Sequence, residues 1–210
     1  MNIRLIIGNV VGVLVVFVLI AAGAYVYYQN ENYIKTSDAV VSADMMPVVS
    51  TYSGVLTDWH VKTGSNVTDK DVVGTVSDGT KAVPVSTRMN GKIIKSDARK
   101  NELVQAGQVL AQEADLDHMY IIANIKEKDL KDLKVGQSVD INVDGDSGKT
   151  FSGTVDEIGY ATTSVFSVLP QQSSTGSYTK VTQKVPVKIS INQPSDKVLP
   201  GMNAEVKISL

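Results

Sequence analysis

The sequence predicts a mainly β chain in which a single N-terminal transmembrane helix precedes two small β-domains. Three observations predict this class: an apolar N-terminal segment, a duplicated unit of short strands, and alternating strands toward the C-terminus. The 210 residues carry 20 basic and 22 acidic side chains, and this balance gives no sign of a nucleic-acid surface. The chain has no cysteine, so disulfides, thiolate metal sites and cysteine nucleophiles are excluded.

The N-terminal segment, residues 5–28, is apolar except for Asn9. A helix of this length is about 36 Å long and could cross a hydrocarbon core of about 30 Å. Tyrosines close the segment like an interfacial belt, and Arg4 before it favours a cytoplasmic N-terminus. We therefore expect a single-pass anchor over 1–28 in the cell membrane, in contact with lipid through 5–28, with the later domains extracytoplasmic. A cleaved signal peptide, whose apolar region is usually about 7–15 residues long, and a buried soluble helix are the alternatives.

The middle of the chain contains a repeat with a fixed offset of 37 residues. Residues 47–76 align without gaps on 84–113, and apolar and turn positions match. Gly64 aligns with Asn101, and both residue types enter the left-handed backbone region at low cost. The aligned identical pairs are Pro47 and Pro84, Val48 and Val85, Gly54 and Gly91, Val67 and Val104, and Val72 and Val109. We expect one duplicated β-domain over 47–115, preceded over 29–46 by an extended linker or first barrel strand.

The two half-repeats are joined by residues 77–83, a short connection. Asp78-Gly79 is typical of a type I′ hairpin turn, so we expect a tight turn with its tip at these two residues.

Residues 116–210 are expected to form a small antiparallel β-barrel with one short helix. The helix is predicted over Glu127–Leu133, before Gly136, and apolar and polar residues alternate in several of the expected strands. The strand candidates are residues 119–125, 139–143, 151–158, 185–191 and 204–210.

A polar loop over Ser164–Tyr178 interrupts this region and contains several apolar residues. Apolar groups exposed in a polar loop favour contact with another surface, although they could equally plug the open end of the barrel. We take four residues of the loop as candidate partner contacts: Phe166, Leu169, Pro170 and Tyr178.

Several segments resemble a known family. The half-repeats resemble the halves of a lipoyl/biotinyl domain, a flattened β-barrel, in Gly54–Leu56, Val61–Val67, Asn90–Ile93 and Val104–Leu110. Tyr33–Val41 resembles the segment after the membrane anchor in EmrA-type adaptors. Phe166–Ile189 resembles their barrel signature, and Leu199–Met202 resembles their last turn. The order of anchor, lipoyl-like halves and barrel resembles the HlyD/EmrA membrane fusion proteins, the periplasmic adaptor subunits of exporters.

This resemblance implies a non-enzymatic adaptor without a cofactor, for efflux, secretion or multidrug export of small molecules. It implies a homo-oligomer that assembles with an inner-membrane exporter, in particular one of the major facilitator type, through the candidate loop residues. Longer members insert a helical hairpin between the two lipoyl halves. Residues 77–83 are too few for a coiled coil, which needs several heptads of about seven residues, so we expect no contact with an outer-membrane channel.

Lys81 lies in Thr80–Val85, a segment that resembles the swinging-arm lysine region of lipoyl carriers. Thr80 replaces the acidic residue that precedes that lysine, and a turn tip at Asp78-Gly79 would put Lys81 on the descending strand. We therefore expect no attached cofactor. The alternatives to the adaptor are a lipoyl or biotinyl carrier modified at Lys81 and a stand-alone envelope ligand-binding protein.

The remaining candidates are expected to be structural. Trp59 and His60 fit a loop with one partly buried aromatic residue, and His118 is expected to cap the junction between the domains. Asp144 and Asp146 resemble part of a calcium loop, but the later ligands of that loop are missing. We expect no metal and no catalytic residues.

Overall fold

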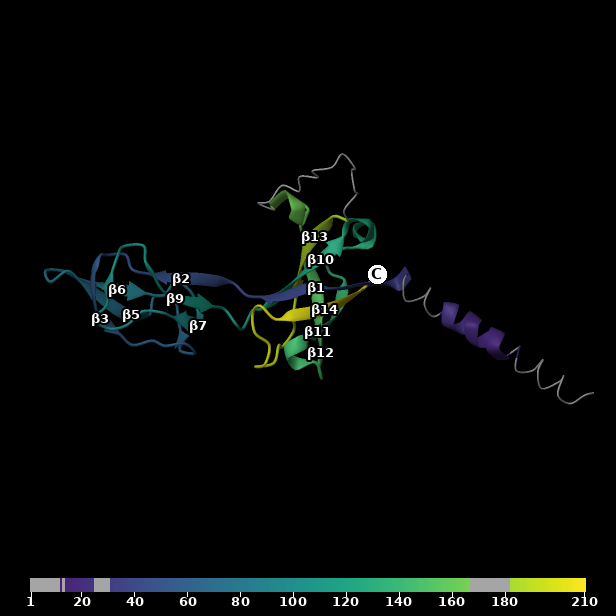
Figure 1. Ribbon diagram of the computed structural model, residues 1–210, viewed down its shortest axis with the longest axis horizontal. Helices are drawn as coiled ribbons and strands as arrows, with labels where there is room; N and C mark the ends of the chain where they lie inside the picture. Colours follow the sequence, from purple (N-terminus) through teal and green to yellow (C-terminus); the bar gives the residue numbers. More distant parts are fainter. Residues whose placement is uncertain (1–11, 13, 25–30, 167–181) are drawn as a thin grey trace, which may run out of the picture.

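Two β-domains follow one another along the long axis of the molecule (Figure 1). The computed structural model describes residues 12, 14–24, 31–166 and 182–210. Strands β2 to β9 form two four-stranded sheets in the first domain, whereas β1 and β10 to β14 form a closed barrel in the second. The predicted mainly β class is therefore confirmed.

The N-terminal segment is described only in part. Residues 14–24 are helical, and their apolar side chains are exposed, with Phe17 at 69%. Within the described residues, no helix combines the length and the apolar character needed to cross a membrane. Much of the expected anchor over 1–28 lies outside the described residues, so the anchor stays a prediction.

The first domain repeats one pattern of four strands. The first half contains β2 (Met45–Val49), β3 (Gly54–Trp59), β4 (Asn66–Val67) and β5 (Val72–Ser77). The second half contains β6 (Ala82–Ser86), β7 (Gly91–Ser96), β8 (Leu103–Val104) and β9 (Val109–Ala114). Every bound in the second half falls 37 residues after its counterpart, so the predicted duplication is confirmed strand by strand.

The two sheets exchange strands between the halves. Their orders are β2-β9-β7-β4 and β6-β5-β3-β8, and swapping each strand for its repeat converts one order into the other. The bulges also repeat, because Thr57 and Ile94 are the extra residues in β3 and β7, and Val73 and Leu110 in β5 and β9. The domain therefore has pseudo-twofold symmetry, and its apolar core lies between the two sheets.

The turn predicted to be shared by the halves has the expected backbone. Gly64 and Asn101 have φ values of +92° and +69°. The Gly64 N–H donates to the carbonyl of Ile93 at 2.7 Å, and the Asn101 N–H donates to that of Leu56 at 2.8 Å. Each half therefore hydrogen-bonds to the other through the same turn.

The hairpin between the halves is tight but differs from the prediction. Residues 78–81 join β5 to β6, and the Asp78 carboxylate accepts the N–H groups of Thr80 and Lys81, both at 2.8 Å. Gly79 has a positive φ whereas Asp78 does not, so the predicted type I′ turn is wrong. Capping by the Asp78 side chain favours the longer loop. Lys81 accordingly lies in this loop, directly before β6, and not on the descending strand as predicted.

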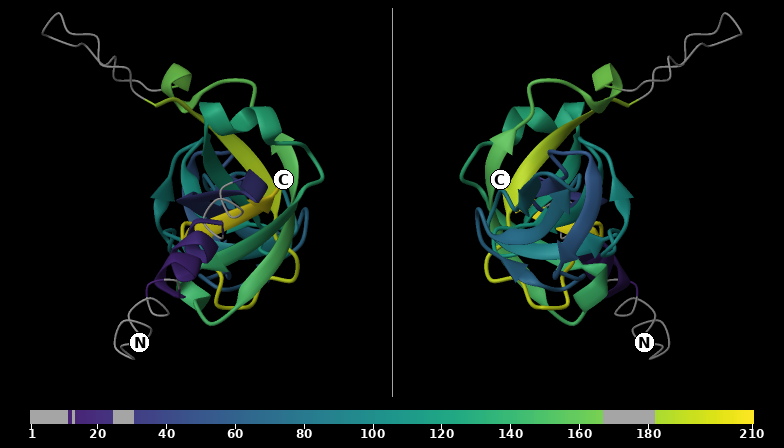
Figure 2. Two further views of the ribbon diagram at one scale, coloured as in Figure 1. Left: turned by 90° about the vertical axis from the view of Figure 1, so that its right-hand side faces the viewer. Right: turned by 90° about the vertical axis from the view of Figure 1, so that its left-hand side faces the viewer.

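The second domain is a closed antiparallel barrel, which Figure 2 views along the long axis. Around the barrel the order is β1 (Tyr33–Ser42), β10 (Tyr120–Lys126), β13 (Lys184–Ser190), β12 (Thr150–Ile158), β11 (Ser138–Val143) and β14 (Asn203–Ser209). A bulge in β1 between Thr36 and Ala39 bends this strand. Alternate residues point inward, as Ile121, Ala123 and Ile125 of β10 do, and form the barrel core.

Three 3₁₀ helices lie between the barrel strands in the described part of the chain: η1 (Glu127–Asp132), η2 (Asp144–Asp146) and η3 (Thr163–Phe166). The short helix predicted over Glu127–Leu133 is therefore present as the 3₁₀ helix η1.

Candidate partner-binding surfaces

A polar network joins three barrel strands at the bulge of β1. Asp38 Oδ2 lies 2.6 Å from Lys184 Nζ on β13, and Asn124 Nδ2 on β10 donates to Asp38 Oδ1 at 3.0 Å. The hydrogen bond from Lys184, with help from that of Asn124, lowers the pKa of Asp38. The network thus links two of the three segments on which the EmrA-type resemblance rests, Tyr33–Val41 and Phe166–Ile189.

The base of the candidate contact loop is fastened to the barrel. Ser164 Oγ in η3 donates to Gln183 Oε1 at 2.6 Å, which joins the residues on either side of the loop. Phe166 ends η3, while Leu169, Pro170 and Tyr178 lie outside the described residues. The four candidate contacts therefore stay a prediction.

Two exposed side chains, one before this loop and one near its start, were missed by the sequence reasoning. Tyr160 is 99% exposed and Val165 is 68% exposed. The Gly159 N–H donates to the carbonyl of Pro186 at 2.9 Å and so holds this corner against β13. For Tyr160 the sequence did contain a signal, because this aromatic residue follows a predicted strand and precedes polar residues. An aromatic side chain in such a position has no core to pack into and is therefore expected to be exposed. Exposed side chains of this kind are candidates for contact with another surface.

Lys81 belongs to a polar cluster at the hairpin. Its side chain is exposed, with Nζ 5.7 Å from the centre of the Tyr52 ring. The Tyr52 hydroxyl donates to Asp78, and this hydrogen bond raises the pKa of Tyr52 and lowers that of Asp78. The cluster stabilises the hairpin at the end of the first domain.

Trp59 ends β3 and packs into the first domain. Its Nε1 donates to Ser96 Oγ at 3.1 Å, and its ring lies where a side chain on Gly74 would be. The neighbouring His60 is exposed, with Nδ1 3.5 Å from Asp58 Oδ2. The partly buried aromatic residue predicted here is therefore confirmed as a packing residue.

Asp146 in η2 is engaged within the chain. Its carboxylate accepts a hydrogen bond from Ser195 Oγ at 2.7 Å and lies 3.8 Å from Lys197 Nζ. These contacts fasten the loop between β13 and β14, and Asp144 takes no part in them. In the described part of the chain, no three His, Cys, Asp or Glu residues are grouped to hold a metal ion.

The joint between the domains is built from two passes of the chain. The Asp115 N–H donates to the carbonyl of Asp44 at 2.9 Å, and the Tyr120 hydroxyl donates to the Asp44 carboxylate at 3.3 Å. Asp115 Oδ1 also accepts the N–H groups of Asp117 and His118, while Oδ2 lies 2.8 Å from His118 Nδ1. This hydrogen bond raises the pKa of His118. The predicted position of His118 at the domain junction is confirmed.

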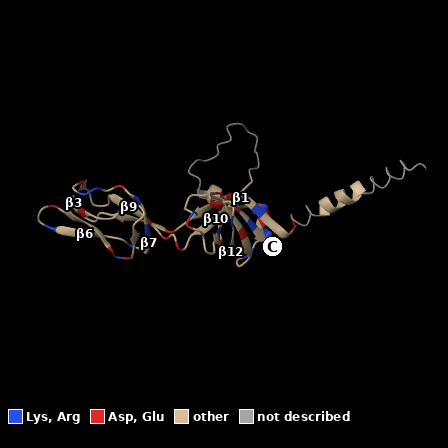
Figure 3. Cartoon of the chain, turned by 90° about the horizontal axis from the view of Figure 1, so that it is seen from below, with Lys and Arg blue, Asp and Glu red and all other residues tan. Residues whose placement is uncertain are grey.

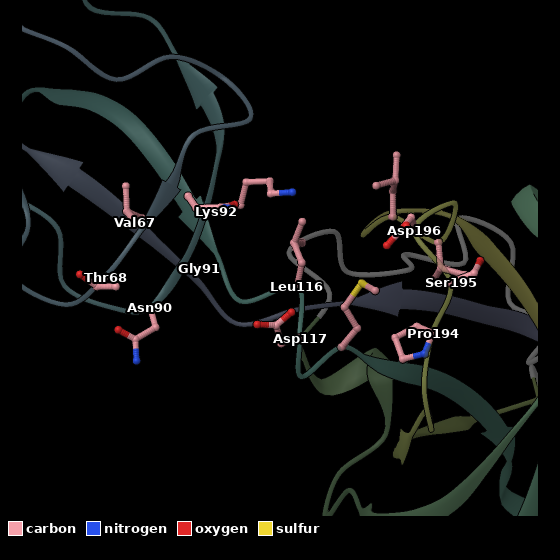
Figure 4. A pocket seen from close by; sticks show the side chains of 14 residues that line it. Val67, Thr68, Asn90, Gly91, Lys92, Leu116, Asp117, Pro194, Ser195 and Asp196 are labelled. Carbon is pink, nitrogen blue, oxygen red and sulfur yellow. The ribbon is translucent and has the colours of Figure 1, made fainter.

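A cleft of about 740 Å³ separates the domains beside this joint (Figure 4). Asn66–Thr68 and Asn90–Lys92 form the first-domain wall, and residues 194–196 with Val198 and Leu199 form the barrel wall. Basic and acidic residues are interspersed over both domains (Figure 3), so no field of one sign marks a polyanionic partner.

A duplicated sandwich domain beside a six-stranded barrel is the architecture of membrane fusion proteins, the adaptor subunits of exporters. The chain superimposes on a MacA–MexA chimera carrying the Pseudomonas aeruginosa MexA hairpin with a TM-score of 0.69 and 16% identity, covering 85% of this chain and 82% of the other. At that identity the likeness establishes the fold.

The sequence identifies the family more closely. Models of the YhbJ barrel-sandwich hybrid domain and the YknX-like β-barrel domain match residues 44–115 and 119–208. The "Putative efflux system component YhbJ" of Bacillus subtilis (strain 168) is 53% identical over 206 residues, covering 98% of this chain and 93% of YhbJ. The chain belongs to the YhbJ family of membrane fusion proteins, which are non-enzymatic.

Two further relatives are similar over part of their length. Multidrug resistance protein MdtN of Escherichia coli (strain K12) is 33% identical over 119 residues, covering 54% of this chain and 35% of MdtN. Multidrug export protein EmrA of Haemophilus influenzae is 29% identical over 130 residues, covering 60% of this chain and 33% of EmrA. The resemblance to EmrA-type adaptors is therefore confirmed, and the matches span about a third of these longer proteins.

Proposed function

We propose that the chain is an extracytoplasmic, membrane-anchored adaptor that holds an efflux exporter of drugs or other small molecules in a working assembly. The observation that carries this proposal is 53% identity over nearly the whole chain to the "Putative efflux system component YhbJ", together with both β-domains of an adaptor. The role is mechanical, since rigid β-modules position a partner without a chemical step.

The N-terminal segment serves as the anchor in this proposal. Residues 5–28 cross the membrane once, with the N-terminus in the cytoplasm and both β-domains outside. The exposed apolar side chains of residues 14–24 support this, because an apolar helix exposed to water has no reason to be stable unless lipid or protein covers it. The barrel is the domain next to this helix (Figure 1), so the barrel meets the membrane-embedded partner.

The partner is an inner-membrane exporter, in particular of the major facilitator type, and it is contacted by the loop after η3. Phe166, Leu169, Pro170 and Tyr178 make this contact, and the exposed Tyr160 and Val165 extend it. The Ser164–Gln183 hydrogen bond supports the assignment, since it holds the two ends of the loop together.

The test is affinity purification from native membranes followed by mass spectrometry of the captured proteins. Wild type should retain an exporter, and F166S/L169S should lose it while remaining folded by circular dichroism. The matched control is V109S, which polarises a half-exposed valine of the first domain and should retain the exporter. Retention by F166S/L169S would contradict the docking loop, and the absence of any exporter with wild type would contradict the function.

A further inference from the structure

Three segments of the chain meet at the end of the barrel that is nearest to the N-terminal helix. The Leu210 N–H donates to the carbonyl of Asn32 at 3.0 Å, so the last residue lies beside the start of β1. Val139 of β11 pairs with Ile208 of β14, so the 134–137 turn before β11 lies at the same end as Leu210. The marked C-terminus shows that this end faces the N-terminal helix (Figure 1). We call the following residues the proximal rim: Asn32, Tyr33, Leu210 and the 134–137 turn.

The proximal rim exposes apolar side chains where the barrel core ends. Val135 is 63% exposed and Leu210 is 43% exposed. Tyr33 is half-buried, and Lys207 Nζ lies 3.7 Å from the centre of its ring. A tyrosine, small apolar groups and a lysine whose stem can lie along an apolar surface are typical of the boundary between lipid and water. The composition of the rim therefore fits a membrane surface.

Charge does not select the partner of this rim. In η1, Lys128 and Lys131 lie 3.9 Å and 3.6 Å from the carboxylate of the aspartate that follows each of them. Asp140 lies opposite Lys207 across β11 and β14. Basic and acidic groups therefore balance locally, and the exposed apolar and tyrosine side chains are what distinguish the rim. Its partner has to accept apolar groups and does not need a strong charge.

The length of the chain between the anchor and the barrel identifies this partner. Asn32 comes four residues after Tyr28, the end of the expected anchor. Four extended residues span at most about 14 Å, so Asn32 cannot lie farther than that from the end of the anchor. The headgroup layer takes about 5–7 Å of this distance. The gap that is left is too small for a folded domain, so the rim faces the lipid itself.

We propose that the proximal rim rests in the headgroup layer of the membrane, with Val135 and Leu210 in contact with lipid beside Tyr33. This rests on the proposed membrane anchor but does not depend on the exporter. A second attachment to the bilayer fixes the tilt of the barrel against the membrane. It thereby sets the side on which the loop after η3 can reach a membrane-embedded partner.

The test uses the full-length, naturally cysteine-free chain in nanodiscs that contain no exporter. V135C carries a fluorophore, and the control L199C carries it on the cleft side of the barrel, where the native leucine is 48% exposed. The discs contain phosphatidylcholine and phosphatidylglycerol in equal parts, with a trace of phosphatidylcholine that carries a nitroxide quencher near its headgroup. V135C should lose fluorescence to the lipid quencher and be protected from iodide in solution, whereas L199C should respond in reverse. Equal responses of the two variants would overturn the proposal.

A second set of variants keeps the position of the fluorophore constant. The label is placed at K134C, and V135S/L210S is compared with L199S in that background. V135S/L210S should lose most of the quenching by the lipid nitroxide, because serine gains nothing from contact with lipid, while circular dichroism stays unchanged. L199S should keep the quenching. Full lipid quenching in V135S/L210S would refute the role of the two apolar side chains.

Capture of the exporter from native membranes separates this proposal from the proposed function. Lipid quenching at position 135 without any captured exporter would support the rim contact and refute the proposed function alone. Capture of an exporter by a chain whose position 135 stays open to iodide in exporter-free discs would refute the rim contact alone. Protection that appears only when an exporter is added would assign the rim to the exporter and overturn the proposal. Failure of the chain to enter the discs would refute the anchor and the rim contact together.

Discussion

Glu113 shows how one residue breaks the symmetry of the duplicated domain. It is fully buried at the position that Val76 holds in the first half. Its Oε1 accepts the N–H of Arg88 at 2.8 Å, while Oε2 has no hydrogen-bond partner within the described structure. Burial is the main cause that raises the pKa of Glu113. The carboxyl group therefore caps the turn before β7 at the cost of desolvation.

The buried carboxyl predicts a pH-dependent stability. Between the ordinary glutamate pKa and the raised value, the native state binds more protons than the unfolded state, so the free energy of unfolding falls as pH rises. We expect E113Q to abolish this fall, whose size is about 1.4 kcal/mol for each unit of pKa shift. Urea unfolding from pH 4 to pH 8 measures it, with the exposed E157Q as the control. An equal pH slope in E113Q and wild type would refute the assignment.

The contact between Asp38 and Lys184 could not be predicted from the residue types alone. Asp38 lies in one segment of the family resemblance and Lys184 in another, and 146 positions separate them in the chain. Their contact depends on the order of barrel strands and on the bulge that turns Asp38 toward β13. Neither feature leaves a local pattern, whereas the left-handed turns at Gly64 and Asn101 do.

At the scale of elements, the fixed offset predicted the first domain well. Turn residues with positive φ values occur at equivalent positions in the two halves. Because each turn fixes where the neighbouring strands end and begin, equivalent turns give equivalent strand bounds. The exchange of strands between sheets was not predictable, because β9 lies between β2 and β7 through long-range pairing. The predicted hairpin type was wrong because the Asp78 side chain caps the loop. The preference of the Asp-Gly dipeptide for a type I′ turn does not take this side-chain hydrogen bonding into account.

Two equivalent glycines, Gly54 and Gly91, lie close to the backbone of a neighbouring strand end. Adding a methyl group at either position is therefore expected to destabilise the fold. A Cβ on Gly54 would collide with the backbone carbonyl of Ser77, and one on Gly91 with that of Ala114. We expect G54A and G91A each to lower the free energy of unfolding by about 1–3 kcal/mol, as overpacking does. G148A is the control, since its Cβ would meet open space. Equal urea midpoints for G54A and G148A would contradict this packing.

At the scale of the whole molecule, the domain order and class were predictable, but the cleft was not. An apolar segment, a repeat and alternating strands are each local in sequence, so their order could be read directly. The cleft arises where β4 and the start of β7 face the 194–199 loop, and only the joint sets that distance. Asp115 holds the joint through the backbone of Asp117 and His118.

We expect D115A to loosen this joint. Cysteines introduced at positions 66 and 196, on opposite walls of the cleft, carry spin labels in an otherwise cysteine-free chain. The distance distribution between the labels should broaden in D115A because the turn at His118 loses its acceptor. The control is D97A, which removes an ion pair with Lys95 away from the cleft. Identical distributions in D115A and D97A would refute the role of Asp115.

The same joint predicts a pH response. Asp115 raises the pKa of His118, so the pairing is fully present below the ordinary histidine pKa and is lost as pH rises through the raised value. The label distances in wild type should therefore broaden over that interval, while those in D115A should not respond. A pH-independent width in wild type would contradict the prediction.

The central claim is that the barrel end of this chain docks on a membrane exporter. Site-specific photo-crosslinking in intact cells tests it most directly, with the photoreactive residue at position 165 near the start of the loop or, as a control, at position 109 in the first domain. Both native side chains are exposed, so neither replacement disturbs the core. The account predicts that position 165 crosslinks to an integral membrane exporter and that position 109 does not. The absence of any membrane protein crosslinked to position 165, or capture of the same exporter by position 109, would contradict it.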